Sequence, residues 1–483
     1  MERLKSNPVV VALVILILGS VIIYAVYQPG DFPSGDTLTF GDVPWKSEVR
    51  GVFTKDTNDF ELLAQTCTSY NVSWVVYEAF GTYFARYPSS VIAGTTRDYI
   101  REGIDACHKY GIKFYAMMLC CFGGSWANLG DMKVVMSNGQ TGDWVCPNRA
   151  SSKQRTRLMV EEVASRYPDL DGFMYDYIRY DTADMCFCDQ CRDRFKTDTG
   201  KTDTVWPTDV IPGGRYRTDF LYWRHVVVTD YAKSIHNWMS TINPNLEFGI
   251  ASFTLFQDSG SYWRYWIAQD TAEMIKEGCV DSISPMMYTA NLGTPDGITD
   301  YIKSNRHYLE GGPDNIAGST QFLPFIADGS LNTITVPQFQ GIISKVRELG
   351  ANGWIVYMYG GPGSPNTVDI RTYLSSIDYP TAFSITNIKV VKNSNTASVS
   401  WSTDVATTGK VEYGLSSFFT WGTTTSYGIP CSILTYSPGT IIPDSSAFQH
   451  SIELPVVKGT RYYFRVQSTN GYMLTSSVYS FVF

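Results

Sequence analysis

The stretch DGFMYDYIRYD, residues 171–181, decides the fold. Its apolar residues lead into a charged cluster formed by Asp176, Arg179 and Asp181. Strands inside a parallel sheet are buried on both faces and read as apolar runs. Charged groups at the carboxyl end of such a strand lie where parallel barrels keep their reactive residues. A strand-ending turn with a surface ion pair would give the same pattern, so the rest of the chain must decide between the two.

Apolar runs of the same kind recur between residues 48 and 377. They are Val49–Thr54, Trp74–Phe80, Lys113–Leu119, Gly172–Ile178, Leu246–Ser252, Val280–Tyr288, Ile316–Leu323 and Gly353–Tyr359. Helical patterns lie between them, at Thr96–Tyr110, Ser152–Tyr167, Phe220–Ile242, Thr271–Glu277, Ile298–Leu309 and Val336–Leu349. Strand–helix alternation of this length predicts an α/β fold, a (β/α)₈ TIM barrel over residues 48–377. The alternative is a doubly wound open sheet, but no Gly-rich phosphate loop follows the first run.

The chain changes character at about residue 381, where helical periodicity ends. Short alternating runs separated by Ser, Thr, Gly and Asn predict an all-β sandwich over residues 381–483. Trp401 and the segment from Gly459 to Val466 resemble a fibronectin type III domain, in which Tyr462 would be the tyrosine-corner residue. Such a module implies spacing or docking of the barrel and no chemistry of its own.

The N-terminus predicts a membrane anchor. Arg3 and Lys5 precede an apolar run from Pro8 to Tyr27, which is long enough to span a bilayer. Cations before the span favour an internal N-terminus and therefore an exported remainder. We expect residues 1–27 to be an uncleaved transmembrane anchor and residues 28–47 a linker. The alternative is a cleaved signal and a secreted protein.

Composition narrows the class of partner. The chain has 483 residues, 44% of them hydrophobic and 17% charged, with a net charge of −8. It is therefore a globular protein of more than one domain, and the lack of a basic run argues against nucleic acid. Aromatic residues make up 14% of the chain, and flat amphipathic rings suit stacking on sugar faces as well as core packing.

Three of the ten cysteines stand close together in CFCDQC, residues 186–191. Three thiols so near in sequence cannot all pair with one another, but Cys186, Cys188 and Cys191 can bind one tetrahedral ion with a fourth ligand from elsewhere. Cys146 on the preceding loop is the natural fourth. Disulfides and free thiols are the alternatives. A shell of four cysteines is closed, so we expect structural zinc and no organic cofactor. The pattern resembles the structural zinc site of family-42 β-galactosidases.

The barrel also resembles a known group of families. Residues 171–180 are similar to the Asp-Gly-x-x-x-Asp-Tyr-Ile-Arg-Tyr signature of the glycosyl-hydrolase-like barrel families. Residues 144–148, 186–195 and 284–288 resemble further segments of these families. The resemblance covers residues 48–377 and implies a carbohydrate context. A distant similarity to family-18 chitinases fails because Ile178 stands where their catalytic glutamate would be.

Glycoside hydrolysis ordinarily uses two carboxyl groups across the scissile bond, about 5 Å apart for retention and about 6.5–9.5 Å for inversion. Asp176 is the first candidate, as nucleophile or general base, with Arg179 holding it ionised. Glu78 is the second, as a general acid protonated through burial beside Tyr77 and Phe80. An equal alternative is that Glu78 is structural and is bonded to backbone or to an arginine. Asp181 and Asp258 are the alternatives for the second carboxylate.

Further substrate-binding candidates are aromatic. Trp126 on the third loop, Tyr288 after the sixth strand, and Tyr357 and Tyr359 in the eighth could stack on sugar rings, and Arg179 and Asp181 could contact hydroxyl groups. Each of these rings could also be core. The sequence therefore predicts a membrane-anchored, extracytoplasmic glycoside hydrolase. The alternative is a non-catalytic glycan-binding or structural surface protein on the same barrel.

Overall fold

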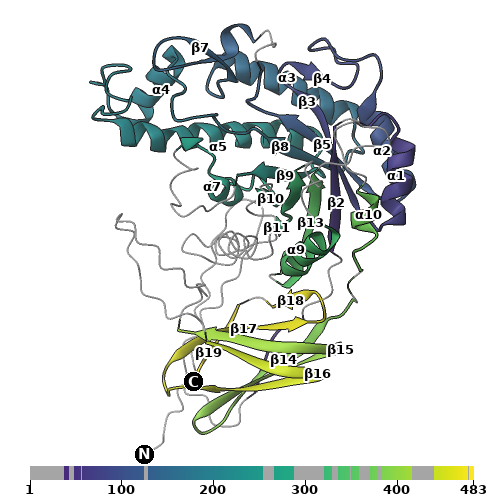
Figure 1. Cartoon of the computed structure of the whole chain (residues 1–483). Coiled ribbons are helices and arrows are strands. Elements are labelled where there is room, and N and C mark those ends of the chain that lie inside the picture. The colour runs from purple at the N-terminus through teal and green to yellow at the C-terminus, as the bar shows by residue number, and fades with distance from the viewer. Residues whose placement is uncertain are drawn as a thin grey trace, which may run out of the picture.

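The computed structural model describes residues 37–42, 48–55, 57–124, 129–253, 266–287, 320–328, 335–348, 350–357, 370–378, 380, 382–415, 440–476 and 478–483. These residues form a barrel and a separate all-β unit, which we call the β-domain (Figure 1). The anchor expected over residues 1–27 lies outside this part of the chain. None of the helices within it is long and apolar enough to cross a membrane.

The barrel has eight parallel strand positions within the described residues. Their strands are β2 (Val49–Thr54), β3 (Trp74–Gly81), β5 (Lys113–Leu119), β8 (Gly172–Asp176), β9 (Glu247–Ser252), β10 (Ser282–Met287), β11 (Gln321–Phe322) with β12 (Phe325–Asp328), and β13 (Gly353–Tyr357). Each pairs in parallel with the next, and β13 pairs with β2, which closes the barrel. The predicted (β/α)₈ barrel is confirmed, and the open sheet is excluded because it would have free edges.

The seventh strand position is divided. Both β11 and β12 pair with β10, and Pro324 lies between them. Proline has no N–H to donate to a strand ladder, so a break at this residue is expected. The predicted strand Ile316–Leu323 lies partly outside the described residues, and the predicted helix Ile298–Leu309 lies wholly outside them.

Side chains of the strands alternate between the barrel interior and the helical layer. The interior holds a cluster that includes Phe53, Val76, Met117, Met174 and Ile355, which we call the inner cluster. The outward side chains join a larger cluster with the helices. Because the inner cluster fills the barrel, a ligand can enter only at its ends.

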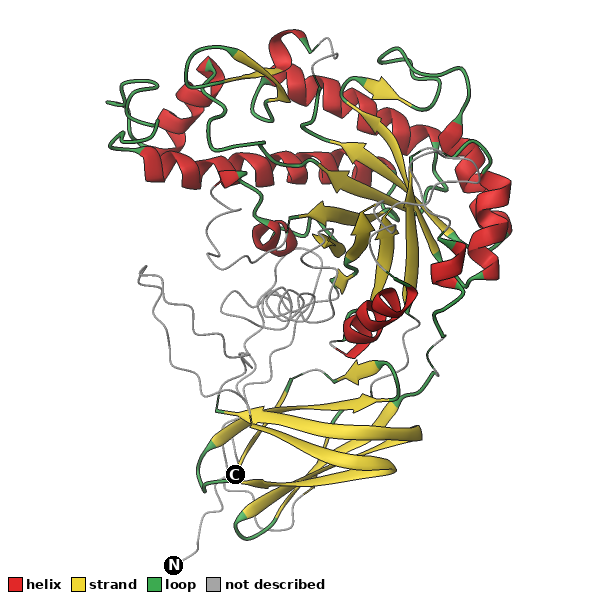
Figure 2. Cartoon of the chain, in the orientation of Figure 1, coloured by secondary structure: helices red, strands yellow, loops and turns green. Residues whose placement is uncertain are grey.

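Helices cover the outside of the barrel (Figure 2). They are α1 (Phe60–Ser69), α2 (Tyr99–Lys109), α3 (Ala150–Arg166), α4 (Asp189–Thr199), α5 (Arg217–Ile242), α7 (Thr271–Lys276), α9 (Val336–Glu348) and α10 (Arg371–Leu374). Asp59, Asp98 and Asp270 are the N-cap residues of α1, α2 and α7. Each carboxylate accepts a hydrogen bond from a backbone N–H of the first turn. Such caps satisfy donors that a helix leaves unpaired at its start.

Short elements are added at the carboxyl ends of the third and second strand positions. The loop after β5 carries the 3₁₀ helix η1 (Gly130–Met132) and the hairpin of β6 (Lys133–Val135) and β7 (Thr141–Val145). β4 (Phe84–Ala85) folds back on β3 as an antiparallel strand. Figure 1 shows β4 and β7 at the same end of the barrel.

The β-domain contains β14 (Ile385–Lys392), β15 (Thr396–Gly414), β16 (Thr440–Pro455), β17 (Arg461–Thr469), β18 (Met473–Thr475) and β19 (Tyr479–Val482). Their buried side chains form a core of their own around Trp401. β1 (Thr37–Thr39) pairs antiparallel with β14, so residues within the predicted linker 28–47 form an edge strand of this domain.

Tyr462 makes the bond expected of a tyrosine corner. Its hydroxyl oxygen accepts a hydrogen bond of 2.9 Å from the backbone N–H of Val457, five residues upstream. A tyrosine at the start of such a strand fixes the preceding loop in the same way in immunoglobulin-like sandwiches. The geometry agrees with the predicted role of Tyr462, while the fibronectin type III assignment itself stays a prediction.

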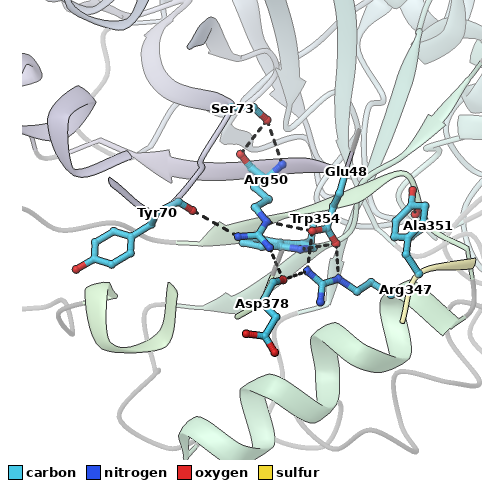
Figure 3. Close-up of polar contacts among 9 residues, drawn as sticks. Glu48, Arg50, Tyr70, Ser73, Arg347, Ala351, Trp354 and Asp378 are labelled. Carbon is cyan, nitrogen blue, oxygen red and sulfur yellow. Dashed lines mark hydrogen bonds and ion pairs between the residues drawn. The ribbon is translucent and has the colours of Figure 1, made fainter. Parts of the chain in front are cut away.

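A buried ionic network joins the amino-terminal end of the barrel to the chain that leads into the β-domain (Figure 3). The carboxylate of Glu48 accepts hydrogen bonds from Arg50 Nε at 3.0 Å, from Arg347 Nε and Nη2 at 2.7 and 2.8 Å, and from Trp354 Nε1 at 3.2 Å. Both arginines also donate to the carbonyl oxygen of Asp378. These bonds form only when β2, α9 and β13 keep their positions relative to one another.

Candidate functional site

Two carboxylates face the barrel interior near its carboxyl-terminal end. Asp176 is the last residue of β8 and has the same orientation along the strand as Met174 of the inner cluster. Glu78 lies in β3 and has the same orientation as Val76. Residues two apart in a strand point to the same face, so both carboxylates lie on the inner side, an orientation that the sequence had left open.

The strand register sets their relative height. β5 lies between β3 and β8, and Asp176 is level with Leu119, which is level with Gly81. Glu78 is level with Met117 and hence with Met174, one inward layer below Asp176. The ladder of β3 and β5 is irregular between Glu78 and Phe80. Bulges of this kind are common next to active sites because they redirect a side chain.

Asp176 holds its proton more tightly than an ordinary aspartate. Burial raises the pKa of Asp176 to about 7, and the charge of Glu78 adds to this effect, while Arg179 and the Tyr177 N–H act in the opposite direction. That N–H donates to Asp176 Oδ1 at 2.6 Å. The attraction of the Arg179 guanidinium thus favours the ionised form of Asp176, but desolvation opposes it and has the larger effect on the pKa. That Arg179 holds Asp176 ionised stays a prediction.

Tyr177 has an unusual backbone conformation beside Asp176. Its φ of 51° is in the left-handed region, which is uncommon for a bulky residue. The conformation aims the Tyr177 N–H at the Asp176 carboxylate, while the Tyr177 carbonyl accepts hydrogen bonds from Cys121 and Arg179. Residues in such conformations concentrate at functional sites, where their surroundings hold them.

Arg179 is surrounded by aromatic rings. Its guanidinium carbon lies 4.9 Å from the ring centroids of Trp144 and Tyr177 and 4.6 Å from that of Phe253. The residue is 8% exposed, and its ion pair among the described residues is with Asp181 at 3.9 Å. Asp181 itself is half-exposed. Arg179 therefore acts on Asp176 only through its charge.

Aromatic rings outside the predicted set gather beside Asp176 and Arg179. We call Tyr83, Phe122, Trp144 and Tyr177 the rim aromatics, since each follows a barrel strand or belongs to a loop at its carboxyl end. Tyr177 lies 4.8 Å from Phe122 and 5.5 Å from Trp144 between ring centroids, and Tyr83 lies 6.2 Å from Phe122. Burial raises the pKa of Tyr83, and the charge of Glu78 adds to the rise, which places Tyr83 near that carboxylate.

Several predicted site residues cannot be placed. Trp126, Asp258, Tyr288 and Tyr359 lie outside the described residues. Tyr357 is described, and its ring stacks on Phe53 of the inner cluster at 4.7 Å. Tyr357 therefore belongs to the top layer of the barrel core.

Glu78 forms an ion pair with Arg86. Arg86 Nη2 lies 2.9 Å from Glu78 Oε1, and the two side chains are 30% and 17% exposed. The alternative of a glutamate bonded to an arginine is thus observed. The pair is nonetheless on the inner side of the barrel mouth, where Glu78 and Asp176 interact electrostatically.

The four cysteines selected from the sequence converge. The sulfur atoms of Cys146, Cys186, Cys188 and Cys191 lie within 4.8 Å of one another, and all four residues are buried. The sulfur of Cys146 is 3.6 Å from that of Cys191 and 4.0 Å from that of Cys188. These four and the other described cysteines are free thiols, so the disulfide alternative does not hold for them.

The arrangement fits a tetrahedral zinc ion. Zinc–sulfur bonds of about 2.3 Å place the sulfurs of a tetrahedral site about 3.8 Å apart, and the Cys146 distances bracket this value. The N–H of Val135 and the side-chain amide of Asn148 donate to Cys186 and Cys191. Arg149 and Lys153 interact electrostatically with the cluster and offset thiolate charge. Bonds of this kind orient metal ligands.

Residues 127–306 match the family described as glycosyl hydrolase-like 10. This segment contains Asp176, Arg179 and the four clustered cysteines. It includes the β8 motif on which the sequence-based resemblance rested. No curated protein matches the chain.

Solved structures of glycoside hydrolases are similar to parts of this chain. A β-galactosidase from the psychrophilic Marinomonas ef1 has 12% identity and a TM-score of 0.47, over 64% of this chain and 54% of its own. A GH42 β-galactosidase from G. stearothermophilus has 11% identity and a TM-score of 0.49, over 71% and 57%. The endo-β-1,4-mannanase from Thermotoga petrophila has 12% identity and a TM-score of 0.40, over 90% and 97%. The chain thus spans a little over half of the β-galactosidases, and at these values the matches support no functional argument.

Proposed function

We propose that the protein is a glycoside hydrolase that cleaves a polysaccharide or surface glycan at the carboxyl-terminal end of the barrel. The observation that carries the proposal is the pair of inward carboxylates with different surroundings. Asp176 is desolvated and holds a proton to about pH 7, whereas Glu78 faces the cation of Arg86. Carboxyl groups whose environments differ in this way divide into a proton donor and an ionised base or nucleophile.

The roles are thus the reverse of those predicted from the sequence. Asp176 donates its proton to the glycosidic oxygen, and Glu78 either activates water or attacks the anomeric carbon. Among the rim aromatics, the half-buried Tyr83 and Phe122 supply faces on which sugar rings stack, whereas Trp144 is buried and both Trp144 and Tyr177 contact Arg179. The match to the glycosyl hydrolase-like family over residues 127–306 supports the same class of substrate.

The test is a panel of polysaccharides incubated with the purified protein, with released reducing ends as the readout. We expect at least one glycan to be cleaved, and the anomer of the fresh product shows retention or inversion. A glycan that binds without releasing ends would overturn hydrolysis and support the alternative of a glycan-binding surface protein.

We also propose that residues 8–27 anchor an extracytoplasmic protein, that the β-domain is a fibronectin III-like spacer, and that zinc holds the four cysteines. The apolar run after Arg3 and Lys5 supports the anchor. N-terminal sequencing of membrane-extracted protein should begin at or next to Met1. A start near residue 28 would instead indicate a cleaved signal.

A further inference from the structure

We propose that Arg86 is a positioning residue that holds Glu78, through a direct ion pair, as the base or nucleophile of the carboxylate pair and leaves Asp176 as its proton donor. The inference rests on the proposed function and adds a residue outside the sequence-based site. It follows from the way in which the hairpin of β3 and β4 returns an arginine to the barrel mouth.

The hairpin places Arg86 by backbone pairing. After β3 ends at Gly81, β4 runs back antiparallel, with Phe80 opposite Ala85 and Gly81 opposite Phe84. The N–H of Arg86 then donates to the carbonyl oxygen of Ala79 at 2.9 Å. Arg86 is thereby held beside the irregular step of β3 next to Glu78. A strand that simply ended at Gly81 would carry no cation to this point.

The guanidinium is held from several sides. Besides its bond to Glu78, it lies 5.9 Å from the ring centroid of Tyr77 and 5.7 Å from that of Phe84. A planar guanidinium can stack on rings while it donates to a carboxylate, which the point charge of lysine does less well. The contacts fix one orientation of the cation and, through it, one orientation of Glu78.

The charged and titratable groups near Glu78 come from three elements. Arg86 is contributed by the β4 hairpin, Tyr83 by the turn before it, and Asp176 and Tyr177 by the end of β8. Two carboxylates that interact electrostatically, as Glu78 and Asp176 do, each make ionisation of the other less favourable. Arg86 compensates only one of them directly, so it breaks the symmetry of the pair.

This division balances the reaction. Asp176 gives its proton to the glycosidic oxygen as the bond from that oxygen to the anomeric carbon breaks. Glu78 takes a proton from the attacking water, or forms an ester with the anomeric carbon that water then cleaves. One water is consumed in either case. In the direct route Glu78 then loses its proton to solvent and Asp176 regains one, whereas in the ester route Asp176 takes its proton back from the attacking water as the ester is cleaved.

The first test needs no substrate. Infrared difference spectra at pH 6 should show a protonated carboxyl that is lost in Asp176→Asn and kept in Glu78→Gln. In an Arg86→Met background, the Glu78→Gln change should also remove part of this band. A wild-type band that disappears with Glu78→Gln, or an Arg86→Met background in which only Asp176 contributes, would overturn the proposal.

The second test uses turnover. Arg86→Met should move the acidic limb of the pH–rate profile to higher pH, because Glu78 loses its cationic partner, and Arg86→Lys should restore part of the shift. Arg97→Met, which removes an exposed arginine from its pair with Glu102, is the matched control and should leave the profile unchanged. An unmoved limb in folded Arg86→Met contradicts the role of Arg86, whereas the absence of turnover in wild type contradicts the proposed function alone.

Discussion

Asp176 shows what a motif determines at the scale of a residue. Its place after an apolar run predicted a carboxylate at a strand end, and Asp176 is the last residue of β8. Its protonation depends on the balance between desolvation and the charge of Arg179, and Arg179 is in turn held by Trp144 and Phe253, which are distant in sequence. Arg86 was missed for the same reason, because only the return of β4 brings it to Glu78.

We expect Asp176→Asn to lower turnover by about 10²-fold or more, the usual effect of losing a general acid. The change should also alter the pH dependence of stability. The pKa of Asp176 is about 7 in the folded protein and about 3.9 in an unfolded chain, so the folded state binds the proton more tightly. The stability that this proton contributes is complete below about pH 4 and is lost as the pH rises through 7.

The melting temperatures of wild type and Asp176→Asn should therefore converge near pH 4, and the variant should be the more stable at pH 8. Asp181→Asn is the control, since Asp181 stands in the same motif but is half-exposed. Equal pH dependence in all three proteins would show that Asp176 is not desolvated.

At the scale of secondary-structure elements, the sequence predicted those strands and helices that have a clear pattern of apolar residues. β2 and β5 have the bounds expected from the sequence, because both are mostly apolar and buried on two faces. α4 was missed, since only Cys191 and Phe195 of its side chains are buried and it has no apolar stripe. Its position is determined by the cysteine cluster, which spacing did reveal. The β4 hairpin is too short to leave a periodic signal.

The cysteine cluster should bind one zinc per chain. It joins the loop after β7, the loop before α4 and the first turn of α4, so removal of the metal should loosen these segments together. We expect Cys146→Ser to abolish the zinc found by elemental analysis and to lower the melting temperature by several degrees. Cys107→Ser is the matched control, because Cys107 is equally buried on α2 but lies outside the cluster. Metal-free wild type with an unchanged melting temperature would exclude a zinc site.

At the scale of the whole molecule, β1 and Tyr472 link the barrel with the β-domain. β1 lies before the barrel in sequence yet pairs with β14, and the hydroxyl of Tyr472 donates to the carbonyl oxygen of Ala351 at 3.1 Å. Figure 1 shows the β-domain next to α9, away from β4 and β7. The β-domain therefore leaves the proposed active end of the barrel open. Composition predicted both units, but pairing of β1 with a strand some 350 residues away depends on the assembled fold.

The Glu48 network should stabilise the amino-terminal end of the barrel, where it contacts the chain that leads into the β-domain. Glu48 is fully buried and is bonded to two arginines, whose other N–H groups hold the Asp378 carbonyl. Removing one partner of a buried ion pair leaves uncompensated charge and costs about 3–5 kcal/mol. We therefore expect Glu48→Gln to lower the free energy of unfolding by about that amount, measured by urea denaturation. Glu102→Gln, which removes the exposed partner of Arg97, should cost about 0–1 kcal/mol. Equal costs for the two variants would mean that the network adds no more stability than a surface ion pair. A large loss confined to Glu48→Gln would show that the amino-terminal end of the barrel depends on this carboxylate for its connection to the chain entering the β-domain.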